Sequence, residues 1–495
     1  MNSMLLKPSS KPWTPHNYQK KAVKFLIAHG AAALFLDPGL GKTSITLAAL
    51  TILKKKKLLG KVLLIAPLRV CHSVWPRELD KWSDFKGLSI AVLHGSQKYR
   101  AELLERDDVD IYVINPEGLE WLLQIEKVTG RSGKVKITLD IRRWKKLGFT
   151  DLVIDELSNF KNHGSIRFKS MKLILHTFNR RWGLTGSPAA NGLMGLFSQC
   201  YMLDQGNALG QYITGYRNNY FIPGHDGFSW DLRNGADEEI YKRISPFVLR
   251  MAANDYLELP QLVENIIKVE LDVKTMEVYR ELERDLITKI DTKVVTAATA
   301  AVASSKCRQV ANGAIYTNSD VQALVKLPKS KKEWVDLHNA KLDALECLID
   351  ELQGSPLLVA YDFGHDLSRL QGRFGRDIPY IGGGVPIKRS TELERLWNTG
   401  RLPVLFGHPM SMSHGLNLQE VGNHVCWFSP TWDYELNDQF TRRVLRQGNK
   451  HKKVFVHYIL ARDTIDEVVF NAVKCKQSVQ NSLFDGLKKL SRSRK

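Results

Sequence analysis

The sequence has few of the features that mark secreted, membrane-bound or metal-clustered proteins. Its six cysteines are scattered, with no Cys-x-x-Cys pair and no histidine spaced to complete a metal site, which argues against a zinc module or a disulfide scaffold. No window approaches the roughly 18 uninterrupted apolar residues of a membrane helix. The start of the chain has only two adjacent leucines where a signal peptide carries about 7–15 apolar residues. We therefore expect a soluble intracellular protein without a membrane partner.

Acidic residues are also in short supply. The 495 residues include 71 Lys and Arg but only 52 Asp and Glu, so the formal net charge is +19. A hydrophobic content of 43% is ample for buried cores, which excludes a disordered basic tail protein. The surplus of positive charge favours a polyanionic partner such as nucleic acid, although a membrane surface or an acidic protein would fit the charge alone.

Short apolar runs that end at turn residues alternate with amphipathic stretches of helical length. This alternation predicts α/β sheets of buried parallel strands. The runs are 31–36, 62–66, 111–114, 152–154, 357–361, 404–406, 425–428 and 454–460. Strand signals thin out between the two groups, where 279–290 is predicted to be helical. We therefore expect an N-terminal lobe over 1–250, a helical connector over 251–337 and a C-terminal lobe over 338–495.

The strongest local signal is a buried strand that runs through a glycine-rich turn into a helix, at Leu34–Thr43. Gly39 and Gly41 let the backbone turn its N–H groups toward an anion, and the helix N-terminus adds positive potential. Lys42 is placed to reach the β- and γ-phosphates of a nucleotide, and the Thr43 hydroxyl is placed to bind Mg²⁺. The phosphate-loop pattern is met only in part, because Leu36 stands at its first glycine position. The predicted nucleotide-binding residues here are Gly39, Leu40, Gly41, Lys42, Thr43 and Ser44.

A second acidic strand end would complete such a site. The run 151–156 is an apolar strand that ends in two carboxylates. We expect Asp155 to lie near the Mg²⁺ shell and Glu156 to act on the attacking water, as a base or as an orienting group. An Asp-Glu pair at a strand end is by itself more often a solvated turn. Its position on a buried strand, after the glycine-rich loop, favours the catalytic interpretation.

Phosphoryl transfer also needs positive charge at the γ-phosphate. Arg443 and Arg446 are three residues apart in 439–446, a spacing that predicts one face of a helix. Such a pair could serve as arginine fingers supplied by the second lobe. Solvated surface or contact with a DNA backbone is the competing interpretation.

Taken in order, these motifs resemble the Swi/Snf-like family of superfamily 2 helicase-related DNA translocases, over most of the chain. The segment Pro15–Gln19 is similar to the family's adenine-reading element, which places Gln19 on the base. Leu64–Val70, continuing to Trp75 and Lys81-Trp82, resembles the family element whose loop touches the nucleic-acid backbone. Gly183–Pro188 with Asn191 resembles the motif that links hydrolysis to lobe movement.

The second half of the chain carries the remaining matches. They are 246–250 and 257–260 before the second lobe, 341–352 and 357–361 within it, then 411–419, 427–432 and 464–467. The resemblance implies two RecA-like lobes with an ATP cleft between them. It also places Gly415 and the arginine pair at the nucleotide, with ATP and Mg²⁺ as cofactors.

Two departures from the family pattern stand out. Asp155-Glu156 is followed by Leu157 and Ser158 where the family usually has Ala-His, so any coupling role of that histidine is absent or moved. Met412 and Ser413 replace two usual glycines. The chain has no room for a chromodomain or bromodomain, and its compact form resembles bacterial or bacteriophage members.

The resemblance implies a DNA-dependent ATPase that moves along double-stranded DNA in replication, repair or recombination. We expect a cytoplasmic monomer, in a bacterial cell and encoded there or by a phage. Three alternatives remain open: a strand-separating DNA or RNA helicase, a motor subunit that needs a nuclease or replication partner, and an ATP-gated DNA clamp.

Overall fold

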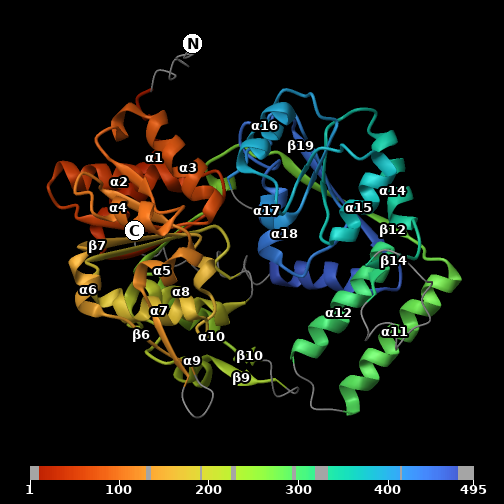
Figure 1. Ribbon diagram of the computed structural model, residues 1–495, viewed down its shortest axis with the longest axis horizontal. Helices are drawn as coiled ribbons and strands as arrows, with labels where there is room; N and C mark the ends of the chain where they lie inside the picture. Colours follow the sequence, from red (N-terminus) through yellow and green to blue (C-terminus); the bar gives the residue numbers. More distant parts are fainter. Residues whose placement is uncertain are drawn as a thin grey trace. The chain divides into compact units, whose positions relative to one another are not determined.

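The chain folds into two units, each built around its own parallel sheet. The computed structural model describes residues 11–129, 135–189, 192–224, 230–292, 297–317, 333–412 and 415–477. The first lobe runs to Leu257 and also includes Lys476 and Gln477, and the second lobe is Glu258–Cys475. Figure 1 shows both lobes with labelled elements. The predicted nucleotide loop, with Asp155, lies in the first lobe, and the arginine pair lies in the second.

The first lobe has a seven-stranded sheet in the order β11-β1-β8-β7-β2-β4-β3. Every neighbouring pair is parallel. The strands are β1 (Ala31–Leu36), β2 (Lys61–Ile65), β3 (Ile90–Val92), β4 (Ile111–Ile114), β7 (Phe149–Asp155), β8 (Arg180–Thr185) and β11 (Val248–Met251). Because β1 and β7 are both parallel to β8, the carboxyl ends of β1 and β7 meet at one edge of the sheet.

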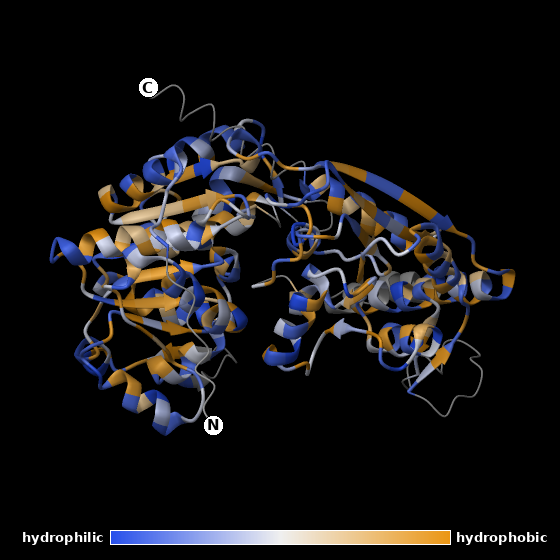
Figure 2. Cartoon of the chain, turned by 90° about the horizontal axis from the view of Figure 1, so that it is seen from above, coloured by the Kyte–Doolittle hydropathy of each residue, from blue (hydrophilic) through white to orange (hydrophobic). Residues whose placement is uncertain are grey.

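Helices and two small hairpins complete the first lobe. The helices are α1 (Asn17–Ala28), α2 (Lys42–Lys55), α3 (Leu68–Lys81), α4 (Gln97–Leu104), α5 (Leu119–Leu123), α6 (Ile141–Lys146), α7 (Ile166–Ile174), α8 (Leu196–Asp204), α9 (Ile213–Tyr220) and α10 (Ala236–Ile244). The hairpins pair β5 (Glu126–Thr129) with β6 (Val135–Thr138), and β9 (Phe221–Pro223) with β10 (Trp230–Leu232). Figure 2 shows the strands as mainly hydrophobic and the helices as mixed, which is the pattern of a sheet covered by amphipathic helices.

The second lobe has a six-stranded parallel sheet in the order β12-β19-β18-β15-β17-β16. Its strands are β12 (Gln261–Val269), β15 (Leu357–Ala360), β16 (Tyr380–Ile381), β17 (Val404–Gly407), β18 (His424–Trp427) and β19 (Lys453–Ala461). Its helices are α11 (Val273–Thr292), α12 (Ala297–Asn312), α14 (Ala340–Glu351), α15 (Gly364–Phe374), α16 (Ile387–Asn398), α17 (Pro409–Met412) and α18 (Tyr434–Thr441), and β13 (Ala314–Tyr316) pairs with β14 (Trp334–Asp336). The two predicted parallel sheets are thereby confirmed.

The segment expected to be a helical connector, 251–337, contains more than helices. β12 pairs with β19 along nine residues and forms the edge of the second sheet. Its side chains are largely exposed, which explains why the segment lacks the apolar run typical of a buried strand. After β12, Tyr279 and Leu282 of α11 pack on Cys307 and Val310 of α12 in a small core. The part of this segment that belongs to the sheet of the second lobe is thus β12, whereas Met251 still belongs to β11 of the first sheet.

No helix within the described ranges combines the length and the apolar character that crossing a membrane demands.

Candidate nucleotide site

The glycine-rich loop connects β1 to α2, at the carboxyl edge of the first sheet. Gly39 and Gly41 adopt the left-handed conformation, with φ of 94° and 80°. A Cβ at Gly41 would lie 2.6 Å from the Gln19 Nε2 and 3.0 Å from the Ser44 Oγ, so only glycine fits. Helix α2 starts at Lys42 with no side-chain cap, so its first N–H groups remain available to an anion. This geometry suits a phosphate group.

Lys42 and Thr43 occupy the first turn of α2. The Lys42 ammonium donates to the Leu36 carbonyl at 2.8 Å, which holds the side chain against the loop. Ser44, the next residue, is buried, and its hydroxyl donates to the Gly41 carbonyl at 3.0 Å. The Ser44 side chain therefore braces the turn, while Lys42 and Thr43 are half-exposed and placed for ligand contact.

Gln19 ties helix α1 to the loop. Its Nε2 donates to the Leu40 carbonyl at 3.3 Å, and its Oε1 accepts from the His16 N–H at 3.0 Å. The side chain is buried. The structure thus brings Gln19 beside the glycine-rich loop, and its predicted contact with adenine stays a prediction.

Asp155 is the last residue of β7, and Trp75 reaches it from α3. The Trp75 Nε1–H donates to the Asp155 Oδ2 at 2.9 Å. Burial raises the pKa of Asp155, while the Trp75 hydrogen bond and the charge of Lys42 act to lower it. The field of Lys42 at this carboxylate shows that the two predicted motifs come together in the first lobe.

Glu156 follows Asp155 in an unusual backbone conformation. Its φ of 62° lies in the left-handed region, which is costly for a residue with a side chain. The turn ends β7 and starts a short helix at Leu157–Phe160. Strained positions of this kind gather at functional sites. Leu157 and Ser158, which replace the usual family residues, are both buried.

The donor set fits a magnesium ion held together with a nucleotide. Mg²⁺ prefers hard oxygen ligands and is usually held by one or two carboxylates plus substrate phosphates. Thr43 and Asp155 offer a hydroxyl and a carboxylate, and a nearby cation would offset the burial that raises the pKa of Asp155. Within the described ranges, no group of three or more His, Cys, Asp or Glu side chains could hold a metal without such phosphates.

A buried ion pair supports the loop from β11. Arg250 Nη2 lies 2.7 Å from Asp37 Oδ1, and the Ala253 N–H donates to Asp37 Oδ2 at 2.9 Å. Gly186, in the motif 183–188, would place a Cβ only 3.1 Å from Pro38 Cδ. The end of β8 therefore packs directly on the glycine-rich loop. Asn191 of the same motif lies outside the described residues.

The arginine pair of the second lobe does not lie on a helix face, contrary to the prediction. Helix α18 ends at Thr441, and hydrogen bonds from Arg443 N to the Phe440 carbonyl and from Val444 N to the Thr441 carbonyl form a tighter turn. Both arginines instead attach to the loop after Gly415. Arg443 Nη1 donates to the Leu416 carbonyl at 3.0 Å, and Arg446 Nη1 donates to the Asn417 Oδ1 at 2.6 Å.

Gly415 and Met412 flank the two positions, 413 and 414, that lie outside the described residues and include the departure at Ser413. Gly415 has a φ of 75°, which suits glycine. Met412 is fully buried, and its Sδ occupies the space that a Cβ on Gly407 would fill. This methionine therefore packs in the core where the family usually has a glycine.

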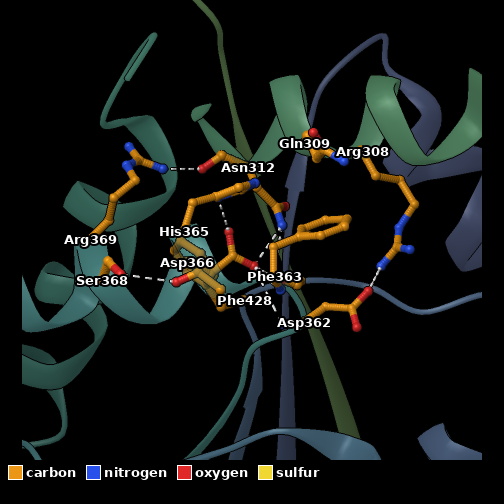
Figure 3. Close-up of polar contacts among 12 residues, drawn as sticks. Arg308, Gln309, Asn312, Asp362, Phe363, His365, Asp366, Ser368, Arg369 and Phe428 are labelled. Carbon is orange, nitrogen blue, oxygen red and sulfur yellow. Dashed lines mark hydrogen bonds and ion pairs between the residues drawn. The ribbon is translucent and has the colours of Figure 1, made fainter. Parts of the chain in front are cut away.

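A polar cluster that sequence reasoning missed joins α12 to α15 and to the loop before it (Figure 3). Arg308 Nη2 lies 2.5 Å from Asp362 Oδ2, and Asn312 Nδ2 donates to Asp366 Oδ2 at 3.1 Å. Burial acts to raise the pKa of Asp366, but hydrogen bonds from His365 and other groups outweigh it and hold that pKa below its usual value. The cluster attaches α12 to the rest of the second lobe. Its partners are 54 positions apart in the sequence, so no local sequence pattern predicts these contacts.

Comparison with known proteins identifies the family. A model described as the SNF2-related domain matches residues 18–324. The chain is 31% identical to protein p41 of Acyrthosiphon pisum secondary endosymbiont phage 1, over 97% of this chain and 100% of that protein. It is 25% identical to an ATP-dependent helicase of Mycoplasma genitalium, over 93% of this chain and 41% of the helicase.

More distant relatives include a RAD54-like DNA repair and recombination protein of Danio rerio, 22% identical over 96% of this chain and 68% of that protein. Among solved structures, the SWI2/SNF2 ATPase core of Sulfolobus solfataricus in complex with dsDNA is 22% identical. The structural alignment covers 99% of this chain and 97% of the Sulfolobus solfataricus chain, with a TM-score of 0.42.

The family model spans more than half of the chain, and the phage relative is similar along its whole length. The resemblance inferred from the motifs is therefore confirmed, including the similarity to a phage member. The chain belongs to the SNF2-related family and is an ATP-hydrolysing enzyme of the helicase superfamily.

Proposed function

We propose that the protein is a DNA-dependent ATPase that converts hydrolysis into movement along double-stranded DNA. The observation that carries this proposal is the meeting of the Gly39–Thr43 loop with Asp155 in the first lobe, within a chain that matches the SNF2-related domain. A relative supports the choice of DNA, since the Danio rerio protein is described as a DNA repair and recombination protein.

The residues divide the chemistry among them. The N–H groups of the Gly39–Thr43 backbone and the Lys42 ammonium would bind the phosphates. Thr43 and Asp155 would hold a magnesium ion, which would supply positive charge to neutralise the developing negative charge. Glu156 orients the attacking water and accepts its proton. Gln19 contacts the adenine. Arg443, Arg446 and Gly415, which lie in the second lobe, are the remaining residues that we propose for nucleotide hydrolysis.

The net charge of +19 fits a partner that is gripped through its phosphates. Contacts to the sugar-phosphate backbone carry no sequence information directly, which a motor that advances along DNA requires. We therefore propose sequence-tolerant binding to duplex DNA. A nuclease or replication protein is a further proposed partner, and the proposed setting is the cytoplasm of a bacterial cell.

The direct test is steady-state ATP hydrolysis with duplex DNA, single-stranded DNA, RNA or no nucleic acid. We expect the largest stimulation with duplex DNA. Lys42→Ala should abolish it, and Lys61→Ala, which changes a lysine of β2 away from the loop, should leave it in place. Equal rates in all four conditions would exclude a DNA-dependent ATPase.

A strand-separating helicase is the second candidate, because the Mycoplasma genitalium relative is described as an ATP-dependent helicase. Release of a labelled strand from a forked duplex, together with no displacement of a triplex-forming strand, would favour it over the translocase.

A further inference from the structure

The indole of Trp75 contacts the candidate nucleotide site, although Trp75 belongs neither to the glycine-rich loop nor to the Asp155-Glu156 pair. Trp75 lies on α3, which follows β2, and β2 is the parallel neighbour of β7 in the first sheet. The carboxyl ends of these two strands therefore lie side by side. Helix α3 begins just after β2, so its start lies close to Asp155 at the end of β7. The Trp75 Nε1–H donates to the Asp155 Oδ2 at 2.9 Å across 80 residues of sequence.

This hydrogen bond differs in kind from those of other buried tryptophans in the lobe. Trp144 is 2% exposed and donates to the Thr177 hydroxyl at 2.9 Å, and Trp182 donates to the His29 carbonyl at 3.1 Å. Both bonds satisfy a buried donor with a neutral acceptor, which is all that packing requires. Trp75, which is 0% exposed, instead uses a carboxylate that the nucleotide site needs.

The indole can act on the carboxylate only as a hydrogen-bond donor. An indole N–H can donate but cannot accept, so it bonds to Asp155 in one orientation only. A hydrogen bond to an ionised acceptor is roughly twice as strong as a neutral one and favours the charged form. The hydrogen bond from Trp75 therefore fixes the orientation of the buried Asp155 carboxylate.

Helix α3 is itself anchored next to this contact. Cys71, one helical turn before Trp75, is fully buried, and its Sγ donates to the Ala66 carbonyl at 3.1 Å. Burial raises the pKa of the Cys71 thiol to about 12, and the charge of Asp155 contributes to the shift. The face of α3 that carries Cys71 and Trp75 thus lies against the end of β7.

We infer that Trp75 is a positioning residue for the divalent cation, holding the Asp155 carboxylate in the orientation that receives the hydrated metal. The inference rests on the proposed function, in which Asp155 holds that ion. Hydrogen-bond partners of metal-binding carboxylates are known to matter, since their loss typically costs about 10–100-fold in metal affinity.

The test compares Trp75→Phe with Trp144→Phe, which removes the same N–H from an equally buried tryptophan of the same lobe. Binding of Mn²⁺ with the non-hydrolysable nucleotide AMP-PNP is followed by electron paramagnetic resonance on the full-length protein. We expect Trp75→Phe to weaken Mn²⁺ binding about 10–100-fold. Trp144→Phe should stay within twofold of the parent. Equal Mn²⁺ affinity in the two variants would overturn the inference.

A single-atom change separates the hydrogen bond from packing. Benzothienylalanine at position 75 places sulfur where the indole has N–H, so the ring shape is kept and the donor is lost. It should weaken Mn²⁺ binding as much as Trp75→Phe does, and an affinity equal to that of the parent would show that only packing matters. In ¹⁵N-tryptophan spectra, the indole resonance missing from Trp75→Phe should shift when Mg²⁺ and AMP-PNP are added together.

Kinetics distinguishes this inference from the proposed function. If the inference holds, Trp75→Phe raises the Mg²⁺ concentration for half-maximal ATPase, while the rate at saturating Mg²⁺ approaches that of Trp144→Phe. An ATPase with unchanged Mg²⁺ dependence would reject the role of Trp75 and leave the proposed function intact. A parent protein without ATPase would reject the proposed function, and the Mn²⁺ measurement would still decide the role of Trp75.

Discussion

At the scale of single residues, Glu156 is the sharpest test of the chemistry. Its backbone is held at a φ of 62° directly after Asp155, a conformation that is costly for a residue with a side chain. Glu156→Gln keeps the shape of the side chain but removes the carboxylate that we propose as the base. We expect ATP affinity to stay within about twofold, while the turnover number falls about 10²–10⁴-fold.

Equilibrium binding of a fluorescent ATP analogue and steady-state hydrolysis measure the two quantities. Asp151→Asn, four residues earlier on the same strand, would be a poor control because Asp151 is buried and paired with Arg180. Glu117→Gln, an exposed carboxylate of the first lobe, is a better one. Turnover near the parent level in Glu156→Gln would remove Glu156 from the mechanism.

The two arginines should behave differently, because their surroundings differ. Arg443 is 8% exposed and donates to the Gln439 and Leu416 carbonyls, so Arg443→Ala should lower stability as well as hydrolysis. Arg446 lies nearer the surface and contacts Asn417. Arg446→Ala should therefore lower the turnover number about 10³-fold with little change in melting temperature or ATP affinity.

Arg462→Ala offers the matched control, since Arg462 is an exposed arginine of the second lobe that pairs with Glu270. If Arg446→Ala changed DNA affinity and left ATP hydrolysis per bound DNA unaltered, the arginine would be a DNA contact and not a catalytic group.

At the scale of elements, a buried histidine, His457, and a half-buried one, His338, make the second lobe sensitive to acid. Burial lowers the pKa of His457, on β19, and of His338, before α14, to about 4 each. His424 adds to the shift at His457, and Arg369 and Lys341 add to that at His338. Between pH 6.5 and about 4, these two histidines are protonated in the unfolded chain but stay neutral in the folded lobe. The free energy of unfolding therefore decreases as the pH falls through this window.

Calorimetric melting temperatures across that window should fall toward acid pH in the parent and fall less in His457→Gln. His176→Gln, an exposed change in the first lobe, should follow the parent. A melting temperature of the second lobe that is flat from pH 6.5 to 4 would contradict this account.

The buried strands were the elements most open to prediction from sequence. Strands such as β1 and β4 are continuous apolar runs, and the structure places them at the predicted residues. β12 was missed because an exposed edge strand alternates irregularly. The end of α18 at Thr441 was missed because the turn is set by contacts of Arg443 and Arg446 with the loop after Gly415, and these depend on tertiary structure.

The same distinction applies to the candidate site. Lys42 and Asp155 could be predicted because each follows an apolar strand in a recognisable motif. The donation from Trp75 to Asp155 could not, because the sheet order that makes β2 the neighbour of β7 is not encoded locally. The ion pair of Asp37 with Arg250 is hidden for the same reason.

At the scale of the whole molecule, the surplus of 19 positive charges predicts how activity depends on salt. A protein that neutralises about six phosphates loses roughly 10³ in affinity between about 50 and 200 mM salt. The DNA concentration for half-maximal ATPase should rise steeply over that range and depend little on DNA sequence. Titrations with two duplexes of equal length and different sequence measure both effects, and a strong sequence preference that persists at high salt would argue for base readout.

Displacement of a triplex-forming strand from duplex DNA tests the central claim of ATP-driven translocation most directly. We predict that the protein releases the third strand with ATP, that it does not do so with AMP-PNP, and that Glu156→Gln is inactive. Two results would contradict the claim. One is release of the third strand without ATP hydrolysis, and the other is no release although duplex DNA stimulates the ATPase.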